Sequence, residues 1–272
     1  MSYYKIETPQ CTFRASIEET QDMYKIKYGG RKACVFFSVY KGYDEEYPNL
    51  DGLVTDKGCN VEESLDDTVL LFKSSLQFLI WRFPNIKYVQ FLDTSKKECA
   101  GGIHIDLATF HFAKHGKTWY EDKFGAKPLD KSRSKYFRRA SEYLDNECPQ
   151  HGFDTFYKEN IMRFVESFKK VKKADVYAML QICWDNAISY KDFFKQVGSK
   201  DCVLFQQWLK TYISSLWKHI AIDTLYWKIS KKVIDSYLIN IKIRSTSTRP
   251  HYMSKGGDGS GPLFGMKEFL II

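Results

Sequence analysis

The sequence predicts an α/β domain, then an all-α helical domain, then an extended C-terminal tail. β-branched and aromatic runs lie before residue 60, and helical patterns surround one buried strand between residues 68 and 124. After residue 131 only helical patterns are found. We therefore divide the chain into residues 1–130, 131–244 and 245–272.

The first part of the chain predicts a mixed sheet. Runs of β-branched and aromatic residues predict strands at residues 26–28, 33–40 and 50–55. Gly29 and Gly30 separate the first two runs, as in a hairpin. Residues 1–20 have a mixed composition around Pro9, so we expect turns there.

Residues 68–83 predict an amphipathic helix. Its apolar residues recur at spacings of three and four, and Pro84 disfavours helical geometry at the residue before it. The next expected elements are a buried strand over 86–92, a turn at 93–95, and helices over 105–113 and 118–124.

The order of these elements resembles the second half of a GNAT-type acyltransferase fold. Residues 120–125, Tyr-Glu-Asp-Lys-Phe-Gly, are similar to the Tyr-Glu-Lys-x-Gly-Phe signature of that fold, with one residue more before the glycine. Residues 62–128 resemble more specifically a GNAT-like family encoded by large nucleocytoplasmic DNA viruses. The residues that carry this second resemblance are Phe83-Pro84-Asn85, Leu92-Asp93-Thr94-Ser95, Cys99 and Gly116-Lys117-Thr118-Trp119-Tyr120-Glu121. The resemblance implies a GNAT-like sheet and a viral protein.

The same resemblance implies where acyl-CoA would bind. In GNAT enzymes a glycine-containing loop and a helix N-terminus hold the CoA pyrophosphate through backbone N–H groups. The equivalent residues 59–68 contain no glycine and carry four carboxylates, Glu62, Glu63, Asp66 and Asp67. These charges repel a pyrophosphate at the helix N-terminus. We therefore expect no cofactor and no catalysis.

An acetyl-CoA-dependent N-acetyltransferase is the alternative hypothesis. Tyr120 matches the family tyrosine that resembles a general acid for the departing thiolate, and one of the four carboxylates would serve as the base. A tyrosine beside Trp119 at a helix start is also a common packing residue. Tyr120 is therefore a catalytic candidate only under this alternative.

Three histidines form a candidate metal site. His104, His111 and His115 follow one another at intervals of seven and four residues, so one continuous helix would place them on a single face. No glutamate stands beside His111 as in a zinc protease, and Gly116 ends the helix. Surface histidines are the simpler interpretation, and we predict no metal.

Residues 131–244 predict a helical bundle without strands. Apolar residues line successive helical faces over 156–171, 176–188 and 204–220. Leu225, Ile229, Val233 and Tyr237 continue the pattern as a fourth helix. Short connections such as Gly198-Ser199-Lys200 favour antiparallel neighbours.

The charge balance permits an acidic partner. The formal net charge is +8, and one basic run contains Lys131, Arg133, Lys135, Arg138 and Arg139. A nucleic-acid-associated viral factor is therefore a second alternative. A solvated helix face is the simpler interpretation of the run, because no helix-turn-helix or zinc-finger pattern accompanies it.

The C-terminal tail combines a linker with an apolar end. Residues 245–262 have the composition of a flexible linker. The candidate docking residues that follow are Leu263, Phe264, Phe269, Leu270, Ile271 and Ile272. We expect this end to dock onto another protein, or to fold back onto its own chain.

The cysteines and the termini bear on location. Seven cysteines without a Cys-x-x-Cys pair favour reduced thiols over a disulfide framework. The N-terminus lacks the apolar core of a signal peptide, and no apolar run is long enough to span a bilayer. We expect a virion or host-cytoplasmic location, without secretion.

These features predict a non-enzymatic structural or interaction protein of a large DNA virus. A minor capsid protein or another virion component fits best. The expected partners are other viral proteins, bound through the C-terminal residues.

Overall fold

The structure is a computed structural model of the chain. It describes residues 1–42, 46–54, 58–59, 67–99, 103–149, 152–167, 173–200, 208–209, 212–213 and 226–247. The chain forms two compact units, and neither is continuous in sequence. The sheet unit contains the described residues of 1–91, 123–127 and 226–271, and the helical unit contains those of 92–122 and 128–225.

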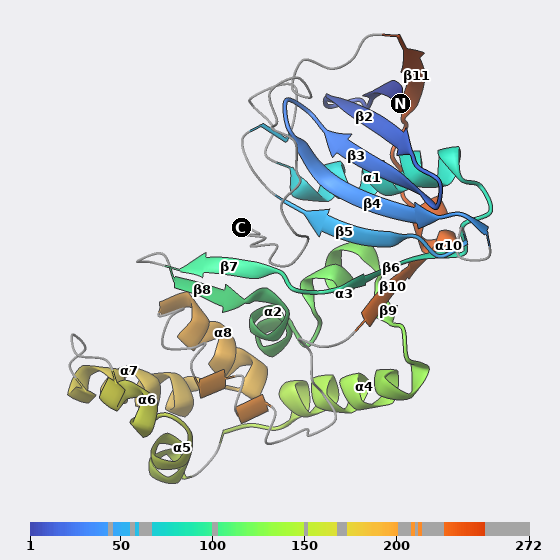
Figure 1. The fold of residues 1–272 in the computed structure, drawn as a ribbon. Helices are drawn as coiled ribbons and strands as arrows, with labels where there is room; N and C mark the ends of the chain where they lie inside the picture. The colour runs from blue at the N-terminus through green and yellow to red at the C-terminus, as the bar shows by residue number, and fades with distance from the viewer. Residues whose placement is uncertain are drawn as a thin grey trace. The chain divides into compact units, whose positions relative to one another are not determined.

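The described residues of the sheet unit form a nine-stranded sheet (Figure 1). Its strands, in spatial order, are β11 (Lys242–Thr246), β1 (Ser2–Glu7), β2 (Thr12–Glu19), β3 (Met23–Gly29), β4 (Ala33–Tyr40), β5 (Asn49–Leu53), β6 (Tyr88–Leu92), β10 (Tyr226–Ser230) and β9 (Lys127–Pro128). Neighbours from β11 to β5 are antiparallel, whereas β5 and β6 are parallel. A parallel pair needs a crossover, which α1 (Thr68–Arg82) supplies.

The start of the chain corrects one prediction. Residues 1–20 do not form turns alone, because β1 and β2 pair as an antiparallel hairpin around Pro9. The Thr8 N–H donates a hydrogen bond to the Cys11 carbonyl over 2.9 Å and closes the turn. Phe13, Ala15 and Ile17 alternate along β2 and are buried. The predicted hairpin of β3 and β4 and the predicted strand at β5 are confirmed.

The helix α1 covers one face of the sheet (Figure 1). Phe72, Phe78 and Leu79 of α1 are fully buried, and the Tyr28 hydroxyl of β3 donates a hydrogen bond to Ser74 Oγ over 2.9 Å. The helix ends at Arg82, one residue before the predicted end at Phe83, which is its C-cap and precedes Pro84. The predicted strand that follows is confirmed as β6.

The predicted fourth helix over 225–237 is wrong. Residues 226–230 form β10 within the sheet, and only the short helix α10 (Lys231–Asp235) follows. Trp227 and Ile229 alternate along β10 and are fully buried, which satisfies the strand period instead of the helical one. Part of the predicted tail is also strand, since Ser245 and Thr246 pair with β1 in β11.

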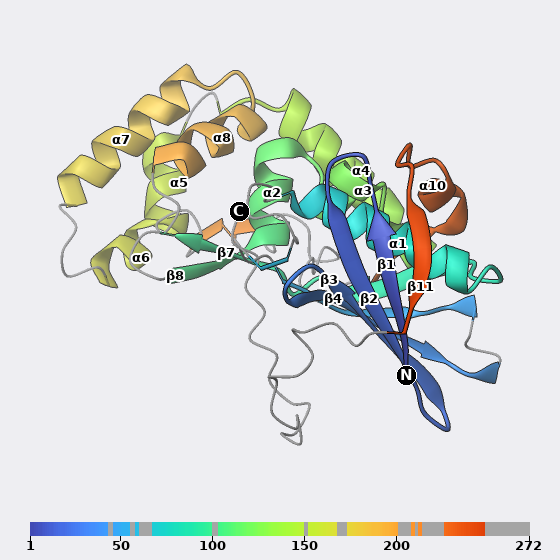
Figure 2. The same ribbon diagram turned by 90° about the horizontal axis from the view of Figure 1, so that it is seen from above.

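The helical unit contains a two-stranded ribbon and most of the described helices (Figures 1 and 2). Its elements are β7 (Lys96–Cys99), β8 (Ile103–Asp106), α2 (Leu107–His115), α3 (Trp119–Phe124, which ends in the sheet unit), α4 (Lys131–Asn146), α5 (Phe153–Asn160), α6 (Met162–Ser167), α7 (Lys173–Asn186) and α8 (Tyr190–Lys200). The ribbon was not predicted. The predicted helix connection at residues 198–200 is wrong, because these residues belong to α8. The helical character is confirmed, and the bundle arrangement stays a prediction.

Aromatic side chains fill the centre of the helical unit. The ring of Phe156 lies 4.5 Å from that of Trp184 and 5.5 Å from that of Trp208, measured between centroids. Within the predicted stripe over 204–220, the described residues Trp208, Leu209, Tyr212 and Ile213 are helical and buried. Among the described residues, no helix has both the length and the apolar character needed to cross a membrane.

Candidate functional site

The N-terminus of α1 is the place where the resemblance puts a cofactor phosphate. The Asp67 carboxylate caps this helix and accepts a hydrogen bond from the Leu70 N–H over 2.9 Å. The Asp67 carbonyl accepts a further bond from the Leu71 N–H. A fixed negative charge therefore occupies the helix end that attracts anions. Glu62, Glu63 and Asp66 lie outside the described residues.

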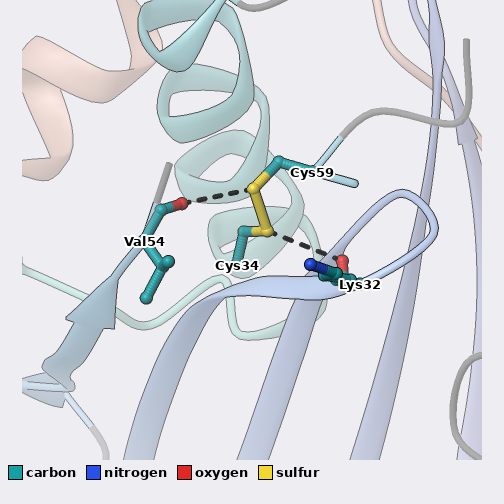
Figure 3. Close-up of a disulfide and its surroundings, with 4 residues drawn as sticks. All are labelled: Lys32, Cys34, Val54 and Cys59. Carbon is teal, nitrogen blue, oxygen red and sulfur yellow. Dashed lines mark hydrogen bonds between the residues drawn. A yellow bond between two sulfur atoms is a disulfide. The ribbon is translucent and has the colours of Figure 1, made fainter. Parts of the chain in front are cut away.

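A disulfide joins β4 to the connection between β5 and α1 (Figure 3). Cys34 at the start of β4 bonds to Cys59, with 5.6 Å between the Cα atoms, and the two residues are 1% and 4% exposed. The Lys32 N–H donates a hydrogen bond to the Gly58 carbonyl over 2.7 Å, which fixes the same segment. The Cys59 sulfur lies 3.3 Å from the Val54 carbonyl oxygen. This is a close contact and not a hydrogen bond, because a disulfide sulfur carries no hydrogen.

This disulfide contradicts the expectation that all thiols are reduced. Cys99 is also disulfide-bonded, whereas Cys11, Cys148 and Cys183 take part in no disulfide. The sequence separation of 25 residues between Cys34 and Cys59 gives no sign of pairing. Only the folding of β4 against β5 brings the two sulfur atoms together.

Tyr120 lies on α3 in the helical unit and is 4% exposed. Its ring packs edge to face against that of Trp119, with 5.0 Å between the centroids. This is the packing role that such a tyrosine commonly has. Its catalytic role stays a prediction.

The three histidines do not share one helix, which corrects that expectation. His104 lies on β8, and α2 begins only at Leu107. The rings of His111 and His115 lie 4.2 Å apart on α2, and His111 Nδ1 is 2.8 Å from the Lys117 carbonyl oxygen. The described part of the chain holds no group of three or more histidine, cysteine or acidic residues placed to bind a metal ion.

The basic run lies on α4. Phe137, Ala140 and Leu144 are buried on one side of this helix. The exposed cations of the run are Lys131, Lys135, Arg138 and Arg139. Arg133 Nε lies 3.8 Å from Asp130, and Arg138 Nε lies 3.7 Å from Glu142. The apolar docking residues of the tail, Leu263 to Ile272, lie outside the described residues.

A groove that was not predicted lies beside α1 in the sheet unit. It has a volume of about 360 Å³ and is lined by Gln77, Ile80, Trp81, Ile234, Asp235, Ile241 and Ile243. Trp81 is 52% exposed, and its ring lies 5.8 Å from that of Tyr4. The one signal for it in the sequence is that Trp81 is an aromatic residue outside the apolar positions that predict α1.

Asp93 is a buried carboxylate in the helical unit and is 3% exposed. Its Oδ1 accepts hydrogen bonds from the Ser95 N–H, over 3.1 Å, and from the Ser95 hydroxyl. Burial raises the pKa of Asp93 to about 7, against the lowering effect of the Ser95 bonds. The sequence indicated a polar turn at this position, without its burial.

No protein-family model, no curated protein and no solved structure matches the chain. Its function is therefore inferred from its own residues.

Proposed function

We propose that the chain acts by binding other proteins and not by catalysis, as a structural or interaction protein of a large DNA virus. A minor capsid protein or another virion component fits this role. The supporting observation is the cap of α1, where the Asp67 carboxylate already accepts the Leu70 N–H. A pyrophosphate at the same turn would meet this like charge.

The disulfide supports a virion location over the host cytoplasm. Disulfides persist at virion surfaces and in other oxidising environments, and they are rare in cytosolic proteins. The Cys34–Cys59 bond is buried within the fold, so it belongs to the folded core. A protein carried in a particle outside the reducing cytoplasm fits this bond.

The groove beside α1 supports a binding role, and its proposed occupant is residues 263–272 of a second copy. The groove is lined by five apolar residues together with Gln77 and Asp235, and it presents Trp81, a residue type that often dominates interface energies. The occupant is apolar as well. Residues 247–262 join it to β11, and a linker of that length spans about 20–25 Å on average and about 55 Å when extended. That reach is enough for a neighbouring copy.

Light scattering of the full chain against a chain ending at residue 262 tests this docking. The full chain should show a mass that rises with concentration, and the shortened chain should stay monomeric. Trp81→Ala should also stay monomeric, whereas the control Tyr226→Ala, at another exposed aromatic residue of the sheet unit, should not change the mass. A full chain that is monomeric throughout, or a shortened chain that still associates, would overturn the docking.

The acetyltransferase is kept as a second candidate because of one observation. β5 and β6 are parallel and joined by α1, and in open α/β sheets ligands bind beyond the carboxyl ends of such strands. Under this reading Tyr120 is the acid and acetyl-CoA the cofactor. A thermal-shift titration decides, because a ligand that binds only the folded state raises its melting temperature.

We expect no shift from acetyl-CoA up to millimolar concentration. ATP at the same concentration is the control for non-specific binding of a polyanion. A saturable shift with acetyl-CoA alone would support the enzyme and overturn the non-catalytic proposal.

A further inference from the structure

One face of the sheet is open to solvent. The large apolar side chains that β1 to β4 bury between sheet and helix point to the other face and are Ile6, Phe13, Ala15, Ile17, Ile26, Tyr28, Val35, Phe37 and Val39, whereas Ser16 and Ser38 are buried on the open face among its longer side chains. Tyr28 bonds to Ser74 of α1, so that other face is the one that α1 covers (Figure 1). On the same side of the sheet, Phe124 packs against Phe72 of α1, and Val233 of α10 lies beside Gly125. No described helix of the sheet unit lies on the open face.

A row of three cations crosses the open face. Lys5 of β1 lies directly opposite Arg244 of β11 on one side and Arg14 of β2 on the other. Residues directly opposite in antiparallel strands share a face and have their Cβ atoms about 5 Å apart. Three like charges therefore stand side by side on three neighbouring strands.

More positive charge surrounds this row. Lys25, Lys27 and Lys242 lie on the same face by register, opposite Glu18, Ser16 and Glu7. Asp51 also belongs to this face, since its carboxylate accepts the Ser38 hydroxyl. Among the described residues of β1 to β5 and β11, this face of the sheet thus carries six cations and three carboxylates.

The cation row is only partly neutralised. Glu7 lies 2.7 Å from Lys5 and 3.6 Å from Arg244, and the hydrogen bond from Lys5 and the charge of Arg244 lower the pKa of Glu7. Arg14 makes no ion pair with a described residue. Like charges on directly opposite residues destabilise a sheet, so these three cations do not stabilise the fold by lying side by side. Their position points to a role in binding.

Aromatic side chains stand beside the cations. The next row across the open face is Tyr3, Ser16, Lys27 and Phe36, from β1 to β4. Tyr3 and Phe36 are half-buried, so each keeps part of its ring accessible. Tyr40 lies farther along β4 on the same face and is exposed. Ser16, which lies between Tyr3 and Lys27 in this row, is buried.

We propose that this open face binds single-stranded nucleic acid. Phosphates would lie along Arg244, Lys5 and Arg14, and bases would stack on Tyr3 and Phe36. A duplex keeps its bases paired inside and cannot use the rings in this way. An acidic protein segment would use the cations alone. This face is separate from the groove beside α1, so its test does not depend on the docking of the tail.

Fluorescence anisotropy with a labelled oligothymidylate of about 20 nucleotides tests the proposal. The triple variant Lys5→Gln, Arg14→Gln and Arg244→Gln should bind at least about tenfold more weakly, with the slope of log K against log salt reduced by about 2. The matched control removes the same charge from α4 as Lys131→Gln, Lys135→Gln and Arg139→Gln. It should bind like the unchanged chain.

Two further comparisons decide between partner classes. Tyr3→Ala with Phe36→Ala should weaken oligothymidylate binding severalfold and leave polyglutamate binding unchanged. An equal loss in the two triple variants would mean general electrostatic attraction, and a loss in the α4 variant alone would place the site on α4. Polyglutamate that binds as tightly as the oligonucleotide would indicate an acidic protein. Each of these three results overturns the proposal. Circular dichroism checks that every variant is folded.

Discussion

At the scale of single residues, two aspartates show how position changes the effect of the same side chain. Asp67 caps α1, so its charge is favourable at the helix end. Asp93 is buried, and two hydrogen bonds from Ser95 do not compensate fully for the loss of hydration. The sequence predicted the negative charge at the start of α1. It could not predict the burial of Asp93, because burial depends on how residues far along the chain pack.

Asp93→Asn should stabilise the protein at high pH. The pKa of Asp93 is raised from 3.8 to about 7 on folding, so the folded protein binds more protons than the unfolded chain between these values. Stability therefore falls as pH rises from about 4 to about 7 and is flat above that range. The asparagine does not titrate, and it should gain up to about 4 kcal/mol at pH 8 and little at pH 4.

Urea unfolding at the two pH values measures this difference. Asp235→Asn is the control, because Asp235 is exposed and pairs with Lys231 on the surface. An equal effect of Asp93→Asn at both pH values would contradict the raised pKa.

At the scale of elements, the hydrophobic period predicted most of the long segments and failed for short ones. The pattern over 68–83 gave α1 correctly, because fifteen residues allow several repeats of the helical period. The five residues of β10 were too few. Ile229 and Val233 are four residues apart, which fits a helix as well. Only the pairing of β10 with its neighbours in the sheet makes this segment a strand. The β1–β2 hairpin cannot be recognised from residues 1–20, because Pro9 fits an irregular loop as well as a hairpin turn.

Removal of the disulfide should weaken the connection between β5 and α1. Cys34→Ser with Cys59→Ser removes the covalent closure of a loop of 25 residues. The free energy of unfolding should fall by about 3 kcal/mol. Chemical unfolding without reductant measures the loss.

Cys148→Ser is the matched control, because Cys148 is a free, half-buried thiol. It should unfold like the unchanged chain. A double variant as stable as the unchanged chain would contradict a structural role for the bond.

At the scale of the whole molecule, the chain returns to the sheet after long excursions. The predicted division placed one domain before residue 130 and another after it. In the structure, β10 and β11 come from the last part of the chain but complete the sheet that begins at β1. Sequence patterns identify elements, but they do not show which distant strands become neighbours, and for this reason the order of the sheet could not be predicted.

A fragment of residues 1–130 should therefore not fold. It lacks β10, α10 and β11, and with them Trp227, Ile229 and Ile234, which are fully buried in the sheet unit. Residues 1–247 retain every described strand and should fold. Amide proton spectra of the two fragments give the comparison, and dispersed signals from residues 1–130 alone would contradict the expectation.

The positions where the chain passes between the units have a mechanical consequence. These passages lie next to Phe91, Lys123, Lys127 and Tyr226, and the strands involved are β6, β9 and β10, which are consecutive at one edge of the sheet. The chain therefore leaves and re-enters the sheet unit at this edge, so a force that pulls on the helical unit through the backbone reaches the sheet there first.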